Sequence, residues 1–170
     1  MTNARPSNVE VRSWRPRRAP ILAITPPPAQ YALTFLVGVG VDWLMPWRPA
    51  WMTIEGVRWA GLALAAAGLV LALVAARRFM ARRTTLNPAG QPAHLVVSGA
   101  HAWSRNPMYL SLTIIYAGVA LALGSAWPLI LVVLPWAAMN WVVIPFEEAR
   151  LSETFGEDYA DYCRRVRRWI

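Results

Sequence analysis

The sequence predicts an all-α fold: a polytopic membrane protein with about four transmembrane helices and short cytoplasmic helices at its C-terminus. Two observations predict this class. First, 56% of the 170 residues are hydrophobic and only 15% are charged, which is too apolar for a typical soluble domain. Second, several apolar stretches approach spanning length, since about 18 helical residues reach roughly 27 Å, close to the hydrocarbon thickness. They are residues 31–47, 59–76, 108–124 and 127–144.

Composition divides the chain into three parts. Residues 1–30 are basic and rich in proline, which predicts a leader that is disordered or lies on the membrane surface. Residues 31–76 should form a transmembrane hairpin whose second helix, dense in Ala and Gly, suits close helix packing. In its first helix, Asp42 either faces a polar cavity or marks an earlier end of the span. Residues 77–170 should comprise a polar ligand-binding loop, a second transmembrane hairpin and the tail. The oligomeric state stays open.

The distribution of arginine predicts the orientation in the membrane. All 17 basic residues are arginines, and most precede the first stretch, separate the second from the third, or end the chain. Because basic segments stay on the cytoplasmic side, both termini and the middle loop should face the cytoplasm. A net charge of +8 is compatible with nucleic-acid binding, but no nucleic-acid motif accompanies it. We therefore expect anionic lipid headgroups, and no nucleic acid, as partners.

Cysteine and histidine give no sign of a metal site. Cys163 is alone, which excludes an internal disulfide. His94 and His101 have neither a cysteine nor a second histidine at metal-ligand spacing. We therefore expect no metal.

The tail after Pro145 predicts two short cytoplasmic helices. Six of the nine acidic residues lie between positions 147 and 161, ahead of a run rich in arginine. Gly156 suits the end of the first helix, and Tyr159, Tyr162 and Val166 form an apolar stripe along which the tyrosines should pack. The arginines at 164–168 should contact lipid headgroups or lie in solvent.

Polar residues flank the second hairpin at both ends of its sequence. Residues 104–109 are Ser-Arg-Asn-Pro-Met-Tyr, and Glu147 and Glu148 follow the last apolar stretch. A tight turn at residues 124–128 joins the two helices, so the hairpin should bring Arg105 and Tyr109 to the glutamates. Charges beside hydrocarbon are costly unless paired or functional, which favours ligand binding by at least one glutamate. The alternative is a solvated first helical turn, favoured by the helix dipole.

Over residues 84–170 the chain carries an ordered set of motifs: Leu95-Val96, Gly99, Arg105-Asn106-Pro107-Met108-Tyr109, Glu147-Glu148, Leu151, Phe155-Gly156, Tyr159, Tyr162 and Val166. This set resembles the isoprenylcysteine carboxyl methyltransferase family and its bacterial and phospholipid-methylating relatives. The resemblance implies an integral enzyme of the bacterial inner membrane that binds S-adenosylmethionine on the cytoplasmic side. It would methylate a small or lipid-like acceptor.

The resemblance also implies roles for individual residues. Arg105 and Glu148 would be catalytic: Arg105 would hold the cofactor carboxylate, or pair with Glu148 to fix the hairpin ends. His101 stands where the family often has tyrosine, and Asn106 replaces the histidine of its Arg-His-Pro motif; both still donate and accept hydrogen bonds. For His101 the alternative is a structural or exposed loop residue. The residues implied to contact the cofactor are Leu95, Val96, His101, Asn106, Pro107, Met108, Tyr109 and Glu147.

One departure from the family concerns the acceptor. Members that act on prenylated cysteine carry an arginine four residues before the first glutamate, where it grips the substrate carboxylate. Here that position is Val143. The missing cation disfavours prenylcysteine as the acceptor and leaves a carboxylate, an amine or a thiol open.

Two other functions compete with methyl transfer. Sterol-reductase-like membrane enzymes share an Arg-x-Pro-x-Tyr element and a similar tail but use NADPH. Their pattern has an acidic residue shortly after the tyrosine, where this chain has Leu110-Ser111-Leu112. In the non-enzymatic alternative, a membrane scaffold or transporter subunit, the glutamates and Arg105 form structural ion pairs only. Such a protein would not bind S-adenosylmethionine.

Overall fold

The computed structural model describes residues 19–81 and 95–170, and within these ranges its regular elements are all helical. Most of the basic leader, together with Arg82, Arg83 and His94, lies outside the described residues. In chain order the elements are α1 (Ile21–Ile24), α2 (Pro27–Leu44), the 3-10 helix η1 (Ala50–Thr53), α3 (Glu55–Ala81), the 3-10 helix η2 (Gly99–Ala102), α4 (Pro107–Leu123), α5 (Ala126–Leu131), α6 (Val133–Ala138), the π-helical turn η3 (Met139–Val143), α7 (Ile144–Phe155) and α8 (Glu157–Arg165).

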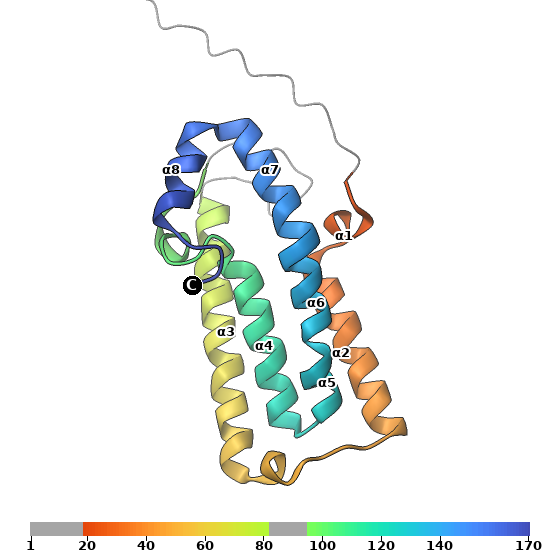
Figure 1. The fold of residues 1–170 in the computed structure, drawn as a ribbon. Coiled ribbons are helices and arrows are strands. Elements are labelled where there is room, and N and C mark those ends of the chain that lie inside the picture. Colours follow the sequence, from red (N-terminus) through yellow and green to blue (C-terminus); the bar gives the residue numbers. More distant parts are fainter. Residues whose placement is uncertain (1–18, 82–94) are drawn as a thin grey trace, which may run out of the picture.

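The long helices lie side by side in an order that differs from their order in the chain (Figure 1). α3 packs along α4, and α2 packs along α5 on the other side of the bundle. The predicted hairpin of the first two spans is therefore wrong: in the described part of the chain, α2 and α3 have different partners. The connection through η1 crosses one end of the bundle to join them (Figure 1).

Glycines allow α3 and α4 to approach closely. A Cβ on Gly118 of α4 would lie 2.5 Å from the backbone nitrogen of Ala65, and one on Gly61 would lie 2.6 Å from the backbone nitrogen of Ala122. Side chains at these positions would therefore force the helices apart. In lipid, where the hydrophobic effect between helices is absent, such contact supplies the packing energy. The small residues of α3 thus have a partner within the chain.

Among the residues that the structure describes, two helices are long and apolar enough to cross a membrane: Glu55–Arg77, with 23 residues, and the continuous helix Ala126–Phe155, with 30. Only 17% and 22% of their most apolar windows are buried, unlike the core helices of a soluble protein. Pro107–Leu123 is apolar but shorter. The predicted first span, in α2, does not meet the same test of length and composition.

The first predicted span ends at a polar contact. Asp42 is buried in the last turn of α2, and its Oδ2 lies 3.0 Å from Nη2 of Arg48. Arg48 Nη1 also donates to the carbonyl of Leu123, at 3.1 Å, just before Gly124 ends α4 in the left-handed conformation with φ +64°. Asp42 therefore marks the end of α2, one of the two predicted alternatives, and its ion pair helps to join α2 to α4.

The last membrane helix continues without a break into the predicted tail. One continuous helix contains α5, α6, η3 and α7 (Figure 1). Pro145 lies in this helix, where its ring would clash with the carbonyl of Trp141 in a regular α-helix. Trp141 belongs to the wider π-helical turn η3, which relieves that conflict. The two predicted tail helices are present as α7 and α8, but α7 continues the preceding helix instead of starting separately. The break comes instead at Gly156, with φ +51°, as predicted.

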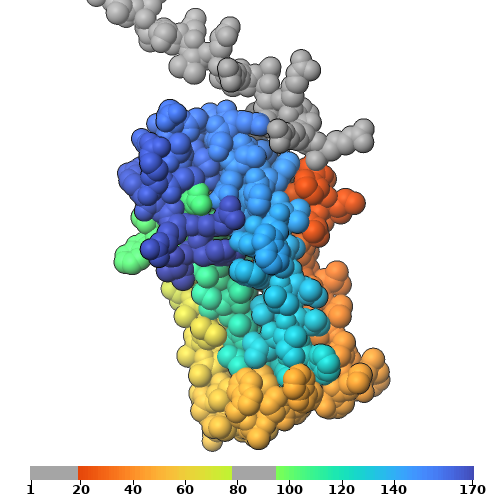
Figure 2. All heavy atoms as spheres, in the orientation of Figure 1, coloured from red at the N-terminus to blue at the C-terminus, as the bar shows by residue number. Residues whose placement is uncertain are grey.

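The tail folds back over the bundle end where α4 begins. After Gly156, α8 reverses direction, and the C-terminal residues return to the start of α4 (Figure 1). In the space-filling view the C-terminal segment covers this end, and the α2–α3 connection covers the other (Figure 2). α1 also lies at the first end, so both ends of the described chain lie on the same side of the bundle.

Candidate functional site

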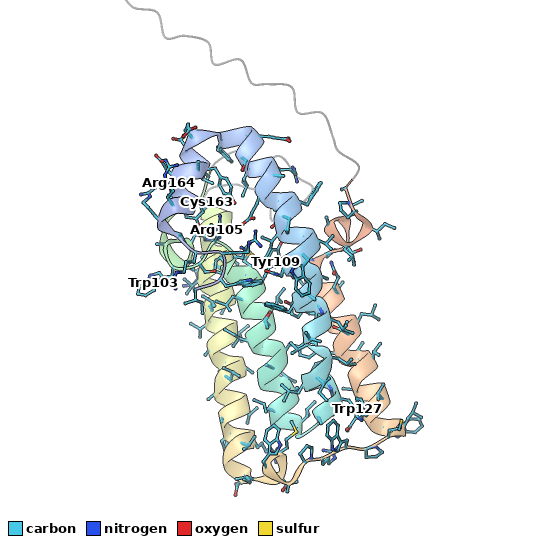
Figure 3. All side chains as sticks on the ribbon, in the orientation of Figure 1. Trp103, Arg105, Tyr109, Trp127, Cys163 and Arg164 are labelled. Carbon is cyan, nitrogen blue, oxygen red and sulfur yellow. The ribbon has the colours of Figure 1, made fainter. Side chains whose placement is uncertain are left out.

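The start of α4 and the start of α7 meet at the tail-covered end of the bundle. The Tyr109 hydroxyl donates to Oε1 of Glu147 across 2.6 Å, and Nη2 of Arg105 lies 3.3 Å from Oε1 of Glu148. The predicted approach of the two helix ends is confirmed. Tyr109 and Arg105 lie at this end, opposite Trp127 (Figure 3). A hydroxyl and a carboxylate at such short range form a charge-assisted hydrogen bond when Glu147 is ionised.

Glu148 carries a second ion pair that the sequence did not predict. Arg168 Nη2 lies 2.5 Å from Oε2 and Arg168 Nε lies 3.2 Å from Oε1, so the guanidinium grips the carboxylate with two contacts. The expectation that all the terminal arginines contact lipid or solvent is wrong for Arg168. Arg105 and Arg168 therefore place two cations around the single Glu148 carboxylate, close to the start of α4.

The segment before α4 is tied to the C-terminal segment through the backbone. The amide of Arg105 donates to the carbonyl of Arg167 at 3.0 Å, and Asn106 Nδ2 donates to the carbonyl of Arg168 at 3.0 Å. Ser104 Oγ accepts from the Asn106 amide at 3.1 Å. Asn106 and Pro107 occupy the cap and first positions of α4, but the Asn106 side chain makes no cap hydrogen bond. It holds the C-terminal segment instead.

The Arg105 side chain is held by two partners. Besides Glu148, its Nη1 contacts Sγ of Cys163 on α8. Burial alone would lower the pKa of Arg105, but the neighbouring Glu148 carboxylate and Cys163 outweigh it and raise that pKa, so the residue is a permanent cation. Its Nε is buried and lacks a hydrogen-bond partner among the described residues. One donor of this cation is thus unsatisfied within the described part of the chain.

The tyrosines of α8 pack as the stripe predicted. Tyr159, Tyr162 and Val166 form a buried cluster to which Leu95 adds its side chain. Burial raises the pKa of Tyr162 to about 12 and raises that of Tyr159 as well, so both hydroxyls stay protonated at neutral pH. Because its side chain packs on this cluster, Leu95 lies beside α8.

His101 belongs to the same end of the molecule. Its side chain is buried, and burial lowers its pKa to about 4, so the imidazole is neutral at neutral pH. The Tyr162 hydroxyl donates to the His101 carbonyl at 2.7 Å. The exposed alternative for His101 is excluded. Val96, in the same segment, is also buried. Because Leu95 and His101 both contact α8, residues 95–101 connect α8 to the start of α4.

The remaining predicted residues have packing roles in the structure. Pro107 is fully buried, whereas Met108 is half-buried and its carbonyl accepts from Ser111 Oγ at 2.7 Å. Val143, in the position of the missing arginine clamp, is completely buried in an apolar cluster with Tyr31, Tyr116, Met139 and Ile144. Within the described ranges, no group of three or more His, Cys, Asp and Glu side chains is placed to hold a metal.

Sequence reasoning missed a further group of residues. Asn140 lies in the π-helical turn and accepts from the indole nitrogen of Trp169 at 3.0 Å. Trp169 also stacks on Trp136, with ring centroids 6.1 Å apart. Asn140 is a polar residue within an apolar stretch, which was the available signal. Nothing in the local sequence distinguished Arg168 or Trp169 from the rest of the basic terminus.

Comparisons with known proteins give one matching protein family and one relative. A model of the phospholipid methyltransferase family matches residues 57–158, which include most of α3, all of α4 and α7, and every predicted site residue. The chain is also 36% identical over 63 residues to an uncharacterized protein of Haemophilus influenzae, an alignment that covers 37% of this chain and 100% of that protein. No solved structure matches.

Proposed function

Because the chain belongs to the phospholipid methyltransferase family, we propose that it is an integral-membrane methyltransferase that uses S-adenosylmethionine. The acceptor is small or lipid-like and is methylated at the cytoplasmic face of a membrane, with both termini on that face. The observation that carries the proposal is the meeting of Tyr109 with Glu147 and of Arg105 with Glu148 at one end of the bundle. Methyl transfer from a sulfonium to a lone pair requires no metal, and these charged groups suit the binding of a charged cofactor.

The residues present suit the two charged ends of the cofactor. Its methionine part has an ammonium and a carboxylate. Glu147, oriented by Tyr109, is the acceptor for the ammonium. Arg105 offers the buried Nε that lacks a partner among the described residues, and the positive end of α4 adds attraction for the carboxylate. Asn106, Pro107, Met108, His101 and the Leu95-Val96 segment complete the proposed binding residues.

The chemistry asks little of the protein beyond alignment. S-adenosylmethionine supplies a methyl group on a sulfonium, which passes to a lone pair by in-line displacement. Glu147 offsets positive charge near the reacting atoms, and the Tyr109 ring can add a cation–π contact worth about 0.5 to 2 kcal/mol. Glu148, fixed by Arg105 and Arg168, holds the two helix ends at a set distance. This preorganisation is how the site would bring donor and acceptor together and exclude water.

Val143 supports an acceptor other than prenylcysteine. It is fully buried among apolar side chains, so it provides no cation for a substrate carboxylate. An acceptor with an apolar chain reaches the site from the bilayer, to which the membrane helices expose most of their apolar side chains. Carboxylate, amine and thiol heads all remain candidates for the screen.

The deciding experiment is calorimetric titration of S-adenosylmethionine into detergent-purified protein. Glu147→Gln should weaken binding at least tenfold, about 1.4 kcal/mol. Glu153→Gln is the matched control, because Glu153 lies on the same helix and is exposed. NADPH is titrated in parallel. Absence of S-adenosylmethionine binding by folded protein would overturn the proposal; saturable NADPH binding would favour the reductase, and binding of neither would favour the scaffold.

A further inference from the structure

A row of tryptophan rings leads from the surface of the bundle toward the candidate site. Trp141 is 67% exposed and meets Trp136 edge to face, with ring centroids 5.7 Å apart. Trp136 in turn stacks on Trp169, at 6.1 Å and an interplanar angle of 28°. The three rings therefore form a continuous aromatic path between an exposed position on the helix Ala126–Phe155 and the C-terminal segment.

The π-helical turn makes this row possible. Residues five apart, such as Trp136 and Trp141, lie on different faces of an α-helix with 3.6 residues per turn. The wider turn at Met139–Val143 brings them onto one side, where their rings touch. Within the same turn, Asn140 fixes the Trp169 ring through its 3.0 Å hydrogen bond. Such turns are often found at functional sites.

The inner end of the row meets the charged residues. Trp169 is half-buried and packs against the apolar cluster that contains Val143 and Ile144, and Tyr109 packs against the same cluster. Tyr109 holds Glu147, and Arg168, the neighbour of Trp169, holds Glu148. Trp169 therefore lies where the aromatic row ends and the proposed methyl-transfer residues begin.

We propose that Trp169 is a specificity-determining residue for the methyl acceptor, its ring contacting the apolar chain of an amphiphile whose polar head reaches Tyr109 and Glu147. The inference rests on the proposed function. An indole suits this position because it offers a large apolar face and one fixed donor, which Asn140 engages. Trp169 also lies beyond residue 158, where the family match ends, so the contact is supplied by a segment outside that match.

Photo-crosslinking tests the contact without relying on activity. The purified protein is labelled with diazirine-bearing stearic acid and, separately, diazirine-bearing stearylamine, each with and without excess unlabelled stearic acid or stearylamine. The label that excess unlabelled competitor prevents, here called competed label, should map to peptides that carry Trp136, Asn140 or Trp169. Trp169→Ala should reduce it at least fivefold, whereas Trp43→Ala, which removes a tryptophan that is 82% exposed at the end of α2, should not.

Further variants and a parallel titration keep the test decisive. If Trp169→Ala fails to fold, Trp169→Phe and Asn140→Leu, which remove the hydrogen bond but keep bulk, should each lower the competed label. Competed label that maps elsewhere, or that survives these changes at the wild-type level, would overturn the inference. Titration of S-adenosylmethionine into the same samples separates the two proposals. If the protein binds S-adenosylmethionine but the tryptophan row is not labelled, only the inference about Trp169 is contradicted. If the row is labelled but S-adenosylmethionine does not bind, the proposed methyltransferase function is contradicted and a binding site for an amphiphile remains.

Discussion

Arg168 and Glu148 are joined by two contacts, of 2.5 Å between Nη2 and Oε2 and 3.2 Å between Nε and Oε1. They lie 20 positions apart in the sequence, on either side of the reversal at Gly156. Because Arg105 also pairs with Glu148, this single carboxylate links the segment before α4, the helix α7 and the C-terminal segment. The candidate site is therefore closed by the last residues of the chain as well as by its membrane helices.

Two substitutions of Arg168 should distinguish the effect of its charge on stability from the effect of its two-point contact with Glu148. Arg168→Gln should lower stability by about 1 kcal/mol, near the upper end for partly exposed ion pairs. Arg168→Lys should recover only part of the loss, because an ammonium cannot make the two-point contact. The thermal unfolding midpoint in detergent measures both variants, with Arg165→Gln, an exposed residue of α8, as control. Equal midpoints for Lys and Arg at this position would contradict the geometric argument.

Removing the Tyr109 hydroxyl tests the role of Glu147. Tyr109→Phe deletes the donor that lies 2.6 Å from the Glu147 carboxylate and leaves the ring in place. A hydrogen bond to a charged group is worth about 1.5 to 3 kcal/mol, so affinity for S-adenosylmethionine should fall at least tenfold. Calorimetry measures the change, and size-exclusion chromatography verifies that the variant is folded. Unchanged affinity would mean that Glu147 is positioned without Tyr109 or does not bind the cofactor.

The fold was predictable where local pattern decides it. Apolar stretches placed the helices of the second hairpin, and Gly156 placed the break before α8. The failures concern partners distant in the sequence. Composition does not reveal that α3 packs on α4 through Gly61 and Gly118, because close approach depends on which faces meet. Likewise, a π-helical turn relieves the clash between the Pro145 ring and the Trp141 carbonyl, and no residue pattern predicts such a turn.

The sequence predicted the residue pairs of the candidate site but not the C-terminal segment that covers it. Arg105, Tyr109 and the two glutamates meet because the turn after α4 fixes the hairpin. Arg168 and Trp169 reach the same place only because α8 reverses, and an arginine run looks the same whether it contacts lipid or a carboxylate. Hydrogen bonds to the carbonyls of Arg167 and Arg168 add a constraint that side-chain identity cannot encode.

Acid should destabilise the protein through His101. Burial lowers its pKa from 6.5 to about 4, so between these values the unfolded chain binds a proton that the folded protein does not. Stability therefore falls as pH drops from 6.5 toward 4, by up to about 3 kcal/mol for this residue. Unfolding midpoints at pH 7 and pH 4.5 measure the effect, and His101→Asn should show a smaller difference than wild type. An equal difference in both proteins would assign the acid sensitivity to other groups.

A methyl group at the α3–α4 contact should test how tightly the bundle is packed. Gly118→Ala places a Cβ 2.5 Å from the Ala65 backbone nitrogen, which cannot move aside as a flexible side chain would. Overpacking of this kind typically costs about 1 to 3 kcal/mol. Gly40→Ala on α2 is the matched control: nothing lies within 4 Å of its Cβ, and alanine favours helix by about 1 kcal/mol. SDS-induced unfolding should thus shift in opposite directions for the two variants. If Gly118→Ala unfolds like Gly40→Ala, the helices are free to separate and the close approach does not stabilise the fold.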